Sequence, residues 1–203
     1  MVDDQTGTTW GHLDGLAVAG SLEGAQLPIL PLQMTTWGAW VDANPATTVI
    51  DVDTGYAYRE QVQLGRDALR GGFLNTLDGI DERLPAGELV IGVLVGSEAV
   101  AFPIEVGTAR PRQAEVDGIP VVILENANGF PSLAYHRALS DGRVLSFERV
   151  DSAIRDVETG TRWSASGLGL EGELAGVQLT FVTSFFTEWY GWAAFHPETT
   201  IFS

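Results

Sequence analysis

Three polar residues in the second half of the chain, Asp156, His136 and Arg137, could carry out acid–base chemistry if the fold brought them together. A carboxylate beside an imidazole or a guanidinium can position a proton or a metal-bound water, as a hydrolase requires. Trp163 would then wall the cleft. No G-x-S-x-G, P-loop or H-E-x-x-H motif occurs, and the absence of lysine excludes a Schiff base. A metal-assisted hydrolase is one hypothesis for this chain.

A second interpretation of Asp156 comes from a repeated motif, D-x-x-T-G-T-x-W. The two copies consist of Asp3, Thr6, Gly7, Thr8 and Trp10, and of Asp156, Thr159, Gly160, Thr161 and Trp163. An Asp in this position can cap the Thr-Gly turn by accepting backbone N–H bonds, while the Trp fills the core beneath it. Since both copies keep the set, a structural role explains it more simply than a binding role for Trp163, Thr159, Asp3, Thr6 and Trp10.

The candidate metal ligands are sparse. Asp51 and Asp53 resemble the start of a calcium loop, but the spacing is one step short of D-x-[DN]-x-[DN]-G and the distal Glu is not in place. His12, His136 and His196 include no H-x-x-x-H pair, so a zinc site would need distant ligands. For His196, which precedes Pro197, we expect a capping or turn role. No cofactor is expected, and calcium or zinc remains an open alternative.

The charge excludes some partners. The chain has 27 acidic and 11 basic residues in 203, a net charge of −16, and every basic residue is an arginine. Such a surface repels phosphate backbones and anionic lipid, so we expect no nucleic-acid partner. No apolar run approaches the ~20 residues of a membrane span, so we expect no membrane insertion. A high-salt habitat and a GC-rich genome would both explain the composition.

The similarity extends beyond the motif. Residues 3–50 and 156–202 share G-x-L-x-G-x-x-L and W-x-x-W-x-x-x-x-P-x-T patterns at a constant offset. Each copy should contain a glycine-punctuated strand pair and one short Trp-rich helix, the second including Phe185, Trp189 and Trp192 and being the more deeply buried. Between them, residues 89–95 and 99–104 should form a hairpin, 119–124 a strand, and 134–139 with 144–148 a second hairpin.

We therefore expect an α+β protein, mainly antiparallel β, built from one complete copy and one half copy of a duplicated unit. The predicted boundaries are a half unit at 1–69, a linker at 70–87 and a complete β-rich unit at 88–203. The half unit's apolar faces need cover, either from the complete unit or from a second chain in a swapped homo-oligomer.

The ordered motifs, together with Asp53-Thr54-Gly55-Tyr56, Glu82-Arg83-Leu84-Pro85 and Ala101-Phe102-Pro103, resemble Domain of Unknown Function family 3179 of bacteria and archaea. The resemblance implies longer members with an additional N-terminal half, which bears a His/Asn/Asp segment and a Cys-Pro-Leu-Cys segment that this cysteine-free chain lacks. It also implies an extracytoplasmic setting. We therefore expect a non-catalytic binding or structural module with an unknown ligand, and keep the hydrolase, with its site between the units, as the alternative.

Overall fold

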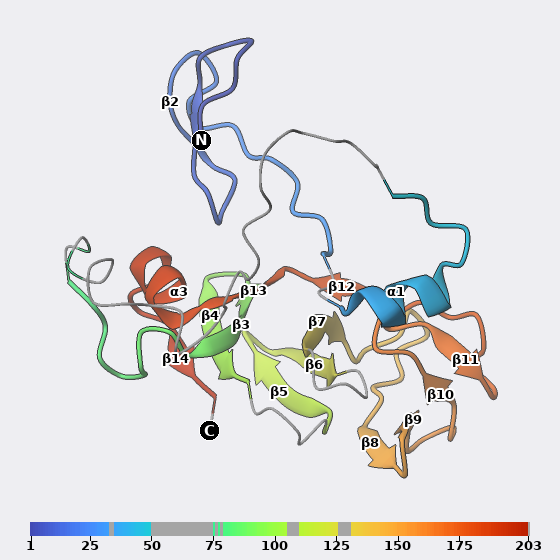
Figure 1. The fold of residues 1–203 in the computed structure, drawn as a ribbon. Coiled ribbons are helices and arrows are strands. Elements are labelled where there is room, and N and C mark those ends of the chain that lie inside the picture. Colours follow the sequence, from blue (N-terminus) through green and yellow to red (C-terminus); the bar gives the residue numbers. More distant parts are fainter. Residues whose placement is uncertain are drawn as a thin grey trace.

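The computed structural model describes residues 1–32, 35–49, 75, 77, 79–104, 110–125 and 131–202 (Figure 1). In these ranges the protein is mostly antiparallel β-sheet with two short helices, as the sequence predicted. The helices are α1 (Trp37–Ala43) and α3 (Trp189–Phe195). Neither helix is long or apolar enough to cross a membrane, and no other described segment forms a candidate span.

One four-stranded sheet has the order β13-β3-β4-β14. Its strands are β3 (Leu89–Val95), β4 (Glu98–Pro103), β13 (Ser184–Glu188) and β14 (Thr200–Ile201). The hairpin of β3 and β4 is the one predicted from two apolar runs joined by a short turn. Only β14 pairs in parallel, with β4, which brings the C-terminal end of the chain back onto this sheet.

A second sheet has the order β12-β7-β6-β5. Its strands are β5 (Arg112–Val116), β6 (Ile119–Glu125), β7 (Pro131–His136) and β12 (Phe181–Val182). Alternate residues of β6 enter different cores: Val121 and Ile123 pack toward β3 and β4, whereas Val122 and Leu124 pack toward the third sheet. The continuous apolar run of β6 therefore reflects a strand that is buried on both faces.

The third sheet, β11-β10-β9-β8, covers the far side of the second. It contains β8 (Phe147–Val150), β9 (Ala153–Asp156), β10 (Arg162–Trp163) and β11 (Gly169–Glu171). The described C-terminal part is thus layered as α3, first sheet, second sheet and third sheet. The N-terminal residues add α1 and a small hairpin of β1 (Thr9–Trp10) and β2 (Ala17–Ala19). Most of this hairpin lies apart from the layers in Figure 1, but Leu13, between its two strands, packs against the core of α3, β3 and β4.

Two sequence predictions differ from the structure. Phe185, expected in the second Trp-rich helix, lies in β13, and the helix begins only at Trp189. All five residues of β13 pair with β3, so backbone pairing overrides the helical spacing of its aromatic side chains. The expected hairpin of 134–139 with 144–148 is reduced to a bridge between Ala138 and Val144, because β8 pairs with β9 instead.

Candidate functional site

Asp156 closes a turn between β9 and β10. Its carboxylate accepts hydrogen bonds from the Thr159 backbone N–H (2.6 Å), the Thr159 hydroxyl (2.8 Å) and Trp163 Nε1 (2.9 Å). The Thr159 hydroxyl is shared with Thr161, 2.7 Å away, and Gly160 supplies the positive φ of 70° that the turn requires. Asp156 and Trp163 are both buried, so the carboxylate, the turn and the indole form one structural unit.

Asp3 makes the same contacts in the N-terminal hairpin. It accepts from the Thr6 backbone N–H (2.6 Å), the Thr6 hydroxyl (2.6 Å) and Trp10 Nε1 (2.9 Å). The hydrogen bonds from Thr6 and then Trp10 lower the pKa of Asp3 from 3.8 to about 2. Here, however, Asp3 and Trp10 are only partly buried, because nothing corresponding to β8 covers them in the described structure.

The three residues predicted to act together in catalysis, Asp156, His136 and Arg137, form hydrogen bonds with separate partners. His136 ends β7, and its backbone N–H donates to Thr180 O. The Arg137 guanidinium donates to Leu145 O at 3.0 Å and faces Gln113 Oε1 at 3.4 Å. All the residues concerned lie in the described part of the chain, and none of the hydrogen bonds or ion pairs there links Asp156 to His136 or Arg137. Catalysis by this set remains a prediction.

The weak metal candidates Asp51 and Asp53 lie outside the described residues. Within the described ranges, no three histidine or acidic side chains gather in a way that could hold a metal ion. His196 caps the C-terminus of α3: its backbone N–H donates to Trp192 O at 2.9 Å, and its ring lies 4.2 Å from the Trp192 ring, tilted by 44°. This agrees with the expected capping role, and burial lowers the pKa of His196, an effect that nearby Asp14 opposes.

A buried ion pair was not foreseen from the sequence. Glu125 at the end of β6 is only 2% exposed, and its Oε1 lies 3.1 Å from Arg112 Nη2 on β5. Arg112 also donates to Pro103 O and lies 5.8 Å from the Phe102 ring centroid. Glu125 borders a small cavity of about 210 Å³ that Arg149 and Arg162 also line. The pair joins the start of β5 to the end of β6 across the hairpin that the two strands form.

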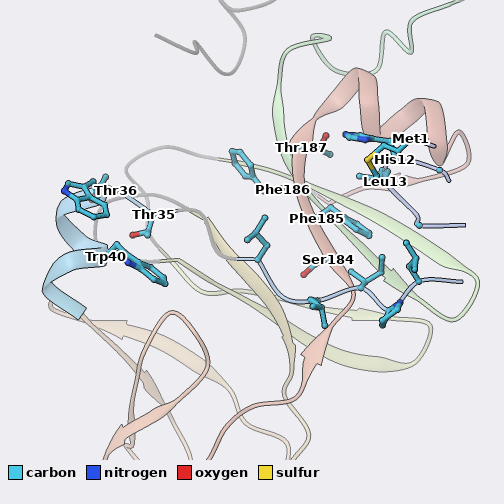
Figure 2. Close-up of a pocket in the computed structure, with 18 residues that line it drawn as sticks. Met1, His12, Leu13, Thr35, Thr36, Trp40, Ser184, Phe185, Phe186 and Thr187 are labelled. Carbon is cyan, nitrogen blue, oxygen red and sulfur yellow. The ribbon is translucent and has the colours of Figure 1, made fainter. Parts of the chain in front are cut away.

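A larger apolar cavity of about 1100 Å³ opens between α1, the extended residues 27–32 and β13 (Figure 2). Trp40 lines it on the α1 side and Phe185 and Phe186 on the β13 side, with His12 and Leu13 at one end. Leu30 and Leu32 are 75% and 83% exposed, and Trp37 is 59% exposed. The sequence predicted that the apolar faces of this segment need cover; it did not predict that these side chains remain exposed in the described part of the structure.

These features define a layered, mainly antiparallel β protein with two Asp-capped Thr-Gly turns and an open apolar cavity. The chain belongs to a family of proteins of unknown function, DUF3179, whose model matches residues 1–199. No curated protein and no solved structure matches it significantly. Its function is therefore uncharacterised, and the hydrolase hypothesis receives no support from relatives.

Proposed function

We propose that this protein is a non-catalytic binding or structural module, and that its binding surface is the apolar cavity between residues 1–49 and β13. One observation carries the proposal. Trp189 and Trp192 of α3 are fully buried, whereas the corresponding Trp37 and Trp40 of α1 are 59% and 44% exposed. Large contiguous apolar surfaces on soluble proteins are commonly interaction sites.

The proposal includes a duplication, in which residues 3–50 and 156–202 are copies of one unit. The two Asp-capped turns support it, and so does the next part of each segment. Gln26 Nε2 donates to Asp14 O at 2.5 Å and to Leu27 O at 3.1 Å, and Gln178 Nε2 donates to Ser166 O at 2.8 Å and Leu179 O at 3.3 Å. The turn glycines Gly20 and Gly172 have φ of 110° and 116°. On this view the second copy supplies its own cover and the first copy offers its apolar face to a partner.

A fluorescent apolar probe tests the surface. Bis-ANS should bind the full chain, and Leu27→Ser should weaken that binding several-fold, because Leu27 lines the cavity. Leu170→Ser is the matched control: Leu170 has the same 44% exposure as Leu27 but lies on β11, away from the cavity. Equal loss in both variants, or no binding by the full chain, would show that this surface is not a binding site.

A further inference from the structure

The partner that would fit α1 can be read from what covers α3. The two helices end in the same way. Trp40 Nε1 donates to Thr47 Oγ1 at 2.9 Å, and Trp192 Nε1 donates to Thr199 Oγ1 at 2.9 Å. The backbone N–H of Asn44 donates to Trp40 O at 2.8 Å, as that of His196 donates to Trp192 O at 2.9 Å. The C-terminal end of α1 thus makes the same two hydrogen bonds as the covered helix α3.

Among the contacts that cover α3, three can be compared with α1, and the first is steric. The Trp192 ring lies directly on Gly92 in β3, where a Cβ would fall 2.1 Å from the ring atoms Cε3 and Cζ3. Any residue larger than glycine would therefore displace the indole. A strand that covers Trp40 in the same way needs glycine at the corresponding position.

The second and third contacts are polar. The Thr199 hydroxyl donates to Ala99 O in β4 at 3.0 Å. The Arg83 guanidinium lies 5.3 Å from the Trp189 ring centroid and donates to Thr199 O at 2.7 Å and Pro197 O at 2.9 Å. The corresponding groups on the α1 side are Trp37 and the carbonyls of Thr47 and Pro45. An arginine on the partner could stack and donate there in the same manner.

The local charge favours such an arginine. Residues 1–49 carry five carboxylates and no lysine or arginine; the carboxylates are Asp3, Asp4, Asp14, Glu23 and Asp42. A basic partner would be attracted to this segment of the protein.

The chain's own hairpin cannot fill this role. The face of β3 and β4 that would cover α1 is occupied by α3, whose Trp189 and Trp192 are completely buried. A second copy presents the same occupied face and carries the same charge of −16, which opposes self-association.

Building on the proposed function, we propose that α1 binds an apolar β-hairpin of a partner protein. The hairpin has glycine in the middle of its first strand, where it meets Trp40, and an arginine ahead of that strand, which stacks on Trp37.

The test uses a synthetic peptide with the sequence of residues 79–104, which contains Arg83, Gly92 and no tryptophan. Isothermal titration of the full chain with this peptide should give one site. Trp40→Ala in the chain should weaken binding at least tenfold, whereas Val144→Ser, at a 45% exposed site remote in sequence from α1, should leave it unchanged. In the peptide, Gly92→Leu and Arg83→Glu should each weaken binding at least tenfold.

A fusion of the peptide to the chain provides a second test if the free peptide aggregates. The same segment is joined by a Gly/Ser linker ahead of Met1, and the full chain is otherwise unchanged. The fusion should have a higher Tm and a blue-shifted tryptophan emission, and both effects should disappear with Trp40→Ala.

Three results would overturn the inference: peptide or tether effects that persist in Trp40→Ala, peptide binding that tolerates Gly92→Leu, or a dimer in native mass spectrometry without peptide that Trp40→Ala dissociates. If bis-ANS binds in the cavity but neither hairpin form does, the proposed function stands and the hairpin assignment fails. If bis-ANS does not bind either, both fail.

Discussion

The Asp156 carboxylate accepts three hydrogen bonds from two side chains and one backbone N–H within eight residues of sequence. All of its partners are local, so the capping role could be predicted from the spacing D-x-x-T-G-T-x-W alone. Its burial could not be, because Asp3 makes the same bonds at a partly exposed site. The hydrogen bonds of this carboxylate are thus determined by residues close in sequence. Its burial, and therefore the free energy lost when those bonds are removed, is determined by segments distant in sequence.

This difference predicts unequal costs for the same substitution. Asp156→Ala should lower the free energy of unfolding by about 1–3 kcal/mol, because it leaves the buried Trp163 donor and the partly buried Thr159 donors without an acceptor. Asp3→Ala should cost clearly less, because water can reach the donors of Thr6 and Trp10. Urea denaturation of both variants measures the difference. Equal costs at the two sites would mean that burial does not set the strength of the cap.

Among the elements, the β3–β4 hairpin was predicted well because its apolar runs and turn lie next to each other in sequence. The strand β5 was missed, because Arg112-Gln113-Ala114-Glu115-Val116 looks polar. Its Arg112 forms an ion pair with Glu125 at the far end of β6, and this pairing is not apparent from the residues of β5 alone. The first residues of the second Trp-rich segment were assigned to a helix for a related reason: their pairing with β3 bridges about ninety residues.

The contact of α3 with β3 predicts opposite effects for two glycines. Gly92→Ala should destabilise the protein by about 1–3 kcal/mol or more, since its Cβ would overlap the Trp192 ring. Gly38→Ala in α1 should instead be neutral or stabilising by up to about 1 kcal/mol, because nothing lies within 4 Å of the added methyl group and alanine favours the helix. Thermal and urea unfolding of the pair provide the measurement. A stable Gly92→Ala protein would contradict the close contact on which the hairpin inference depends.

At the scale of the whole molecule, an exposed apolar surface on residues 1–49 and a strongly acidic composition occur in one chain. Residues 1–49 expose many large apolar side chains, including Leu30, Leu32 and Trp37. A net charge of −16 repels other copies and so limits nonspecific association through this face. The same charge also acts within each molecule, where like charges on the folded surface oppose compaction.

This internal repulsion predicts that dilute salt stabilises the fold. The Debye length falls from about 30 Å at 0.01 M to about 8 Å at 0.15 M, so repulsion between distant carboxylates is largely screened over that range. The few ion pairs at the surface, such as Arg143 with Asp141 and Glu173, lose little by comparison. Tm should therefore rise with NaCl between these concentrations, and equally with NaSCN, because screening depends on ionic strength and not on the kind of anion. A Tm that falls in both salts would show that attractive pairs outweigh the excess of negative charge, and a rise in NaCl alone would point to the strengthening of apolar contacts instead of screening.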